Sequence, residues 1–430
     1  MRTSTGSVAP GWFYGTIAFG SVGLVMTAPL TALFAKDLGA SDAVAALIVS
    51  VMALSFLCLD LVASRVVSRV DARLALAGGY AVFGVGSLVS ALAPNLAVMT
   101  LARALQGLAA ALPMGAGFHM ALRFARPGRQ GGEIARFNAA SFIGMAIGPL
   151  GAGAIADAIG GEAGLRWAFA VCGVLNVAAA FLALGALPSV PSPERPEFGL
   201  PAREVFTGTR VRRALIAAGL GFGLRGIVGL TLLPLLGDDL GATAAVVALA
   251  TTVHAVSELA GTMVAGRLAD AAGRKPVTAG AAAATAALLL VTMASPTVPI
   301  LLASCGAAGF AMAALRVVPA ATVVDVAASD EAAAAGWRIA CDVNGLVAAG
   351  LLGIVIGVSG LHGGFVYASL TACAVGLFAV SIGETHARVR PAGVGDVVPI
   401  AAPEDCLDRP GYDVAPAPSH RFRAGWRARR

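Results

Sequence analysis

The residues Gly266-Arg267-Leu268-Ala269-Asp270-Ala271-Ala272-Gly273-Arg274-Lys275 form a short polar stretch between two long apolar runs. Gly266 permits close approach of two helices, and Gly273 supplies the backbone freedom that a tight reversal requires. Asp270 is the one acid of the stretch, and it can accept hydrogen bonds from a nearby helix start. The stretch therefore predicts a hairpin loop between two membrane helices, held on the cytoplasmic side by Arg274 and Lys275.

The composition agrees with a membrane setting. Only 13% of the 430 residues are charged and 58% are hydrophobic, whereas a soluble domain carries roughly 25% charged residues. The net charge of +6 would fit a nucleic-acid partner only if the basic residues gathered on one surface, and they are dispersed among loops. We therefore expect a polytopic membrane protein with the lipid bilayer as a partner and no nucleic acid.

A hydropathy window of about 19 residues predicts twelve spans. They cover about 12–34, 43–64, 74–94, 97–121, 136–159 and 166–187, then about 213–236, 242–265, 276–295, 298–323, 337–359 and 363–383. We expect an N-terminal bundle at 1–187, a central cytoplasmic loop at 188–212, a C-terminal bundle at 213–383 and a disordered cytoplasmic tail at 384–430.

Positive charges predict the orientation of these spans. The loops assigned to the inside carry most of the basic residues, among them Arg65, Arg69, Arg73, Arg123, Arg136, Arg267, Arg274 and Lys275, whereas the outside loops show only Lys36 and Arg166. The positive-inside rule then places both termini in the cytoplasm of a cell membrane. Residues 1–11 lack the features of a cleavable signal peptide.

An internal repeat relates the two halves. Asp37-Leu38-Gly39-Ala40-Ser41 reappears as Asp239-Leu240-Gly241-Ala242-Thr243, an offset of 239 − 37 = 202 residues. At the same offset, 64–73 corresponds to 266–275, with Asp71 in place of the second glycine. The repeat predicts two duplicated six-helix bundles. The first-half copy is either part of a gate or a solvated basic turn, since surface ion pairs contribute little.

The stretch 266–275 resembles the signature loop of the major facilitator superfamily, Gly-x-Leu-Ala-Asp-x-x-Gly-Arg-Lys, at every fixed position. The resemblance implies an all-α membrane fold of twelve helices in two pseudo-symmetric six-helix bundles, and a secondary transporter. It also implies a gating loop, made of Gly266, Asp270, Gly273, Arg274 and Lys275 and of Arg65, Arg69 and Arg73 in the first-half copy. In the family the first-half copy is usually the better kept.

The fourth predicted span contains Arg103-Ala104-Leu105-Gln106-Gly107, which places Arg103 and Gln106 on one helical face. A guanidinium inside the apolar slab is costly and normally faces a cavity or a partner. The run resembles the superfamily motif Arg-x-x-Gln-Gly, whose arginine is implicated in proton coupling, and we expect Gln106 on the substrate cavity. The alternative is a helix-end arginine that extends outward to the membrane surface.

The fifth predicted span contains the run 144–153, in which Gly144, Gly148, Pro149 and Gly153 combine small residues with a helix-bending proline. The run is similar to the antiporter motif Gly-x-x-x-Gly-Pro-x-x-Gly-Gly of drug:proton exporters, and departs from it at Ala152. The resemblance implies export. The alternative is glycine-rich packing without directional meaning, because the chain contains 54 glycines.

The second half carries charge inside its predicted spans. Arg225 and Arg316 occupy positions that line the central cavity in the family that the chain resembles. His254 and Glu258 share a helix face at a spacing of four. Such groups must pair or face water. We expect proton coupling at Glu258 and His254, because desolvation drives a lone carboxylate toward its neutral form. The alternative is a static ion-pair network.

Two further acids belong to the predicted coupling set. Asp342 follows Arg338 by four residues at the start of the eleventh span, and Asp60 lies near the end of the second. We expect a smaller role for Asp342, since Arg338 neutralises it locally.

The predicted substrate is small and amphipathic, either neutral or anionic, because the first and fourth spans contain no acid for a cation. No Walker loop is present, and Gly221–Gly226 follows no strand, so we expect no enzyme, nucleotide cofactor or metal site. The leading hypothesis is proton-coupled efflux by alternating access, carried out by a monomer. The alternatives are uptake of an organic anion and a transport-inactive membrane sensor.

Overall fold

The computed structural model describes residues 10–67, 70–124, 130–190, 208–327 and 330–385. The described residues belong to one compact unit, 1–388, and residues 386–430 are not described. The predicted tail therefore stays a prediction. So does the division at 188–212, because 191–207 are also not described.

The first half forms α1 (Pro10–Met26), α2 (Leu30–Asp37), α3 (Asp42–Val67), α4 (Ala72–Ala91), α5 (Leu96–Phe124), α6 (Gln130–Ile159) and α7 (Gly161–Ala186). The second half forms α8 (Thr209–Ile227), the π-helical turn η1 (Val228–Leu232), α9 (Leu233–Asp239), α10 (Ala244–Ala272), α11 (Arg274–Met293), α12 (Val298–Val326) and α13 (Asp330–Ile382). The described residues contain no strand, and the predicted all-α class is confirmed.

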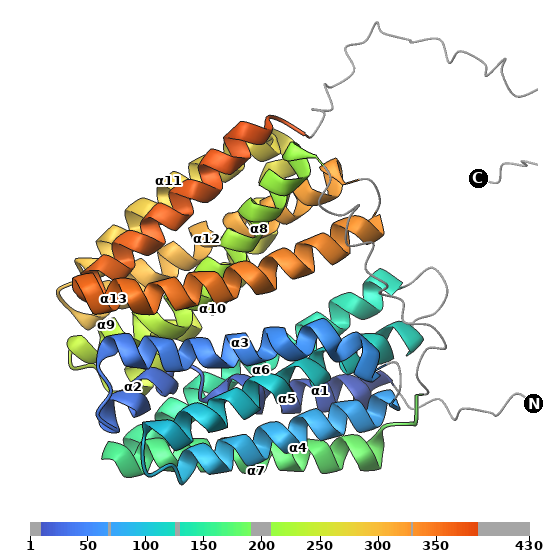
Figure 1. The fold of residues 1–430 in the computed structure, drawn as a ribbon, viewed down its shortest axis with the longest axis vertical. Helices are drawn as coiled ribbons and strands as arrows, with labels where there is room; N and C mark the ends of the chain where they lie inside the picture. The colour runs from blue at the N-terminus through green and yellow to red at the C-terminus, as the bar shows by residue number, and fades with distance from the viewer. Residues whose placement is uncertain (1–9, 68–69, 125–129, 191–207, 328–329, 386–430) are drawn as a thin grey trace, which may run out of the picture. The chain divides into compact units, whose positions relative to one another are not determined.

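Eleven of these helical segments are long and apolar enough to cross a membrane. The last, Gly336–Ile382, has 47 residues, more than twice the roughly 20 that one crossing needs. Gly360 interrupts it with φ +70° and ψ −176°, where the chain turns back on itself (Figure 1). The two arms of α13 correspond to the eleventh and twelfth predicted spans.

The predicted repeat is visible in the backbone. Gly39 and Gly241 end their helices at φ +90° and +68°, a conformation that glycine adopts without strain. Ser41 and Thr243 then begin α3 and α10, and each side-chain oxygen accepts a hydrogen bond from the backbone N–H three residues later, at 3.4 and 3.5 Å. The same local rules therefore shape the equivalent turn in both halves.

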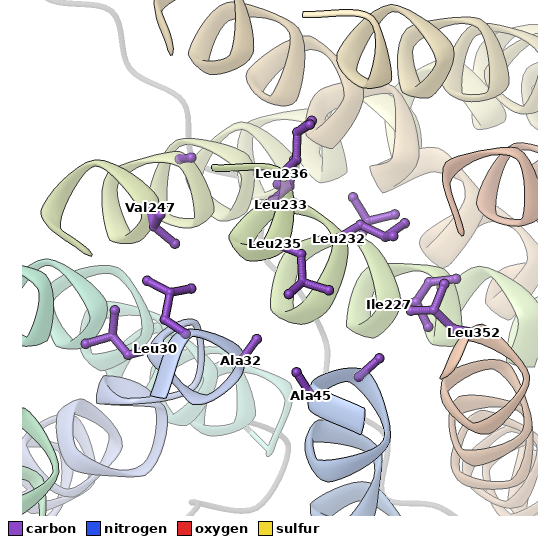
Figure 2. Packing of buried hydrophobic residues seen from close by; sticks show 14 of the residues in the cluster. Leu30, Ala32, Ala45, Ile227, Leu232, Leu233, Leu235, Leu236, Val247 and Leu352 are labelled. Carbon is purple, nitrogen blue, oxygen red and sulfur yellow. The ribbon is translucent and has the colours of Figure 1, made fainter. Parts of the chain in front are cut away.

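The bundles pack against each other at the end that holds these two turns, which we call the turn end. Figure 2 shows buried residues of α2 and α3 facing residues of η1, α9 and α10. Each is at most 6% exposed, and they are Leu30, Ala32, Ala45, Leu232, Leu233, Leu235, Leu236 and Val247. This apolar contact excludes water between the bundles at the turn end. The opposite end, which we call the loop end, holds the end of α3, the start of α4 and residues 266–275.

Candidate functional site

A cavity of about 380 Å³ lies between the bundles, next to the turn-end contact. Its volume falls in the range of small-molecule sites, about 300–1,000 Å³. The wall comes from α1, α3, α5 and α6 on one side and from α8, η1, α10 and α13 on the other. Most lining residues are apolar, and the polar side chains among them are Arg103, Arg225, Thr231, Thr251, His254 and Asp342.

Only some of the residues predicted to line the substrate cavity are found in its wall. Arg225 lines it as expected, whereas Gln106 and Arg316 are not among the lining residues. Gln106 is fully buried because its side chain is used in a hydrogen-bond network within the N-terminal bundle. The predicted place of Gln106 and Arg316 on the substrate cavity therefore stays a prediction.

Glu258 of α10 is the centre of a buried charge cluster. Its Oε2 lies 2.8 Å from Nε of Arg225 on α8, and its Oε1 lies 2.9 Å from Nε of Arg316 on α12. The carboxylate side chain is only 3% exposed. The sequence left two possibilities for Glu258, a desolvated lone carboxylate and an ion-pair network with Arg225 and Arg316, and the structure shows both guanidinium groups paired with it. The cluster holds one more positive charge than negative.

His254 lies one turn before Glu258, is 2% exposed and lines the cavity. Its Nδ1 is 3.1 Å from the carbonyl oxygen of Cys305. A carbonyl only accepts, so Nδ1 carries the hydrogen and Nε2 of the neutral ring keeps its lone pair. Nε2 is buried without a hydrogen-bond partner among the residues described. It is a vacant acceptor beside the charge cluster.

Arg103 of α5 is 2% exposed, so the alternative of an arginine that reaches the membrane surface is wrong. Its Nη1 donates to Oε1 of Gln106 at 2.6 Å, and Nε2 of Gln106 donates to Oγ of Ser87 at 2.7 Å. Its Nη2 lies 3.0 Å from the sulfur of Met52. This network holds the guanidinium at the wall of the cavity.

The predicted hairpin loop at 266–275 is shorter than expected, because α10 continues to Ala272 and α11 begins at Arg274, and the stretch is attached to its own bundle. Gly273, at φ +100°, ends α10, and the backbone N–H of Arg274 donates to Oε1 of Glu384 at 2.9 Å. Nε of Arg274 also pairs with Oδ2 of Asp325 at 2.9 Å. Asp270 is exposed and has no hydrogen bond or ion pair within the described part of the chain. Glu384, not Asp270, therefore caps the nearby helix start.

In the first-half copy of the signature stretch, the structure explains why Asp71 replaces the second glycine. Asp71 begins α4, and its side chain accepts from the backbone N–H of Arg73 at 2.8 Å. Asp71 thus caps α4 from within the loop, as Glu384 caps α11 from a distance. Nη1 of Arg73 lies 3.4 Å from two carbonyl oxygens near the end of α7. Arg69 and the side chains of Arg65 and Asp60 lie outside the described residues.

Comparison with known proteins identifies the family of the chain and structures with a similar fold. The family model of the Major Facilitator Superfamily matches residues 11–228 and 214–403. The chain belongs to this superfamily. Two solved structures of POT family transporters, one with a thioalcohol-conjugated peptide and one with 5-aminolevulinic acid, align with TM-score 0.70 at 12% identity. Each alignment covers 87% of this chain and 96% of the other, and at that identity it shows the fold alone.

A puromycin resistance protein of Streptomyces alboniger is 34% identical over 150 residues, which is 35% of this chain. The chain spans 28% of the length of that relative. Family and fold together show a multi-pass membrane transporter of the major facilitator superfamily, not an enzyme.

In this major facilitator, α6 packs closely through the glycines of the predicted antiporter motif. A Cβ atom on Gly144 or Gly148 would lie 2.5 Å from the backbone of α1, at Ser21 and Val22. On Gly153 it would lie 2.7 Å from Cα of Ala245 in α10, which belongs to the other bundle. Pro149 lines the cavity. These glycines permit helix contacts that any larger side chain would prevent.

Lys36 makes ion pairs across the bundles that sequence reasoning missed. Its Nζ lies 3.0 Å from Oδ1 of Asp42 in its own bundle, but also 2.5 Å from Oδ2 of Asp238 and 3.6 Å from Oδ1 of Asp239 in the other. Asp238 is the repeat counterpart of Lys36, since 36 + 202 = 238. Opposite charges at equivalent repeat positions were the signal that could have revealed this contact.

Proposed function

We propose that this transporter exports a small amphipathic compound, neutral or anionic, in exchange for protons. The observation that carries the proposal is the cavity itself, which is apolar over most of its wall and presents Arg103 and Arg225 from opposite bundles. The likeness of 144–153 to an antiporter motif and the similarity to a puromycin resistance protein support export. Uptake of an organic anion on the same cavity is the second candidate, supported by the same two arginines.

Alternating access is the mechanism that we propose, with the halves moving about the central cavity. Apolar packing and the Lys36 pairs close the turn end, while the ion pair of Arg274 at the loop end stays within one bundle. With the positive loops inside, the turn end faces outward. We therefore assign this conformation to the state that is open toward the cytoplasm. In this state Asp270 makes no ion pair within the described residues, and we propose that it forms one when the loop end closes.

For proton coupling we propose competition at the charge cluster. An anionic substrate near Arg225 weakens the attraction between Arg225 and Glu258, because both anions compete for one guanidinium. The carboxylate released from Arg225 is the proton acceptor that we propose. His254 lies one turn away with a vacant Nε2, and it provides a second place for that proton.

The function is tested with a susceptibility screen in a pump-deficient host. Cells that express the wild-type protein are compared with cells that express Asp270→Asn, over puromycin and a set of neutral, anionic and cationic amphipathic compounds. Export predicts increased resistance to a neutral or anionic compound, and uptake predicts increased sensitivity. No difference for any compound would contradict both and favour the transport-inactive sensor.

Movement at the turn end is tested with a disulfide between the bundles. A Cβ on Gly357 would lie 3.4 Å from Cβ of Ala43, close to the roughly 3.5–4.5 Å of a disulfide. The pair Ala43→Cys and Gly357→Cys, with exposed Cys58 and Cys373 changed to Ser, is expected to cross-link and to stop transport in vesicles. Reductant restores transport, and the single variant Ala43→Cys stays active. Full activity of the oxidised pair would exclude opening at the turn end.

A further inference from the structure

We propose, on the basis of the transport function above, that Arg103 is the group that binds the substrate anion first, because in this conformation the other arginine of the cavity wall, Arg225, is already paired with Glu258. The ligand of Arg103 is a planar monoanionic group of the substrate, with a carboxylate as the best match. A guanidinium offers parallel N–H donors that match the two oxygens of a carboxylate. This assignment differs from the coupling role that the motif resemblance implies for Arg103.

The donors of Arg103 are mostly unused. A guanidinium has five N–H donors, and the structure uses one on Gln106 and one on the weak sulfur acceptor of Met52. Nε is buried and has no hydrogen-bond partner among the described residues. An arginine with an unused Nε at the wall of a cavity is prepared to receive oxygen acceptors from a bound molecule.

The charge of Arg103 is also uncompensated. Within the described ranges, no carboxylate lies at ion-pairing distance from it, and both neighbours that it contacts are neutral. The buried carboxylate of Glu258 is occupied by two other arginines. A buried charge without a counter-ion is costly. A substrate anion would supply the missing charge, and so would bind more tightly than its neutral analogue.

Two other roles fit Arg103 less well. A proton carrier must release its proton, and arginine stays protonated in proteins. A structural cation would tie together groups of opposite charge, whereas the network behind Arg103, from Gln106 to Ser87, consists of neutral groups that orient it. Gln106 is therefore a positioning residue for the guanidinium.

The proposal is tested by binding to the full-length protein in nanodiscs with three compounds on one ring system: 2-naphthoate, 2-naphthamide and 2-naphthylmethylamine. Wild type is expected to bind the carboxylate about 10- to 100-fold more tightly than the amide, the range for hydrogen bonds to a charged group. Arg103→Gln should reduce this ratio to about one while amide binding persists, and Arg103→Lys should keep part of it. The control Arg123→Gln, an exposed arginine of the same helix, should keep the full ratio.

Failure to bind 2-naphthoate, a preference for the amine, or a carboxylate preference that survives Arg103→Gln would overturn the proposal. A second measurement, the melting temperature of the ligand-free protein, needs none of the three naphthyl compounds. If Arg103 is uncompensated, Arg103→Met should leave the melting temperature of ligand-free protein unchanged or raised, and a large decrease would instead show a structural cation. Neither the binding ratio nor the melting temperature depends on transport direction or proton coupling. Both measurements therefore still test the role of Arg103 if proton-coupled export is disproved.

Discussion

Glu258→Gln is expected to abolish proton-driven accumulation of substrate in everted vesicles while substrate binding persists. The carboxylate is the group that Arg225 and Arg316 share, at 2.8 and 2.9 Å. A neutral amide cannot exchange a proton and leaves both guanidiniums without a counter-ion. We expect accumulation to fall by at least about tenfold, the effect of roughly 1.4 kcal/mol. The measurement is uptake into vesicles with an imposed pH gradient, alongside substrate binding.

The controls separate coupling from folding. Removing one partner of a buried ion pair costs about 3–5 kcal/mol, so membrane content and melting temperature are measured for each variant. Glu258→Asp keeps the charge and should recover part of the transport. Asp342→Asn removes the same charge from another position of the cavity wall, and we expect a smaller loss. Glu258→Gln vesicles that still accumulate substrate and lose it with an uncoupler would show that Glu258 is not the proton site.

Gly153→Leu is expected to reduce transport as strongly, for a steric reason. At Gly153 a Cβ atom would lie 2.7 Å from Cα of Ala245 and 2.9 Å from the carbonyl oxygen of Ala244, which are backbone atoms of the other bundle. The helices α6 and α10 must then separate, and the closed turn end is lost. Insertion of extra side-chain volume into such a contact costs about 1–3 kcal/mol or more, and we expect transport to fall at least tenfold.

Gly151 provides the matched control for this steric effect. It lies on the same helix, and a Cβ there would meet nothing within 4 Å. Gly151→Leu should keep transport within about twofold of wild type, as substitutions away from close contacts do. Gly148→Leu is a second test, because Gly148 contacts α1 within its own bundle at 2.5 Å. Equal activity of the three variants would mean that the likeness to the antiporter motif reflects composition only.

Several features could be predicted from residues that are near one another in the chain. The fold class followed from the long apolar runs, because each crossing needs about 20 apolar residues whatever its partners are. The family followed from 266–275, because these ten consecutive residues match the family pattern at every fixed position. The equivalent turns at Gly39 and Gly241 followed from a repeat whose backbone conformation glycine alone adopts easily.

The candidate site depended on contacts that local patterns do not encode. The sharing of Glu258 by Arg225 and Arg316, and the pairing of Lys36 with Asp238, join helices that are far apart in the sequence. The side chain of Gln106 donates a hydrogen bond to Ser87, on another helix. Spacing along one helix shows which residues share a face, but the rotation of that helix follows from packing against its neighbours. Sequence therefore determined the membrane fold and the family, and only the tertiary structure decided which charges meet and that the buried Arg103 has no counter-ion among the residues described.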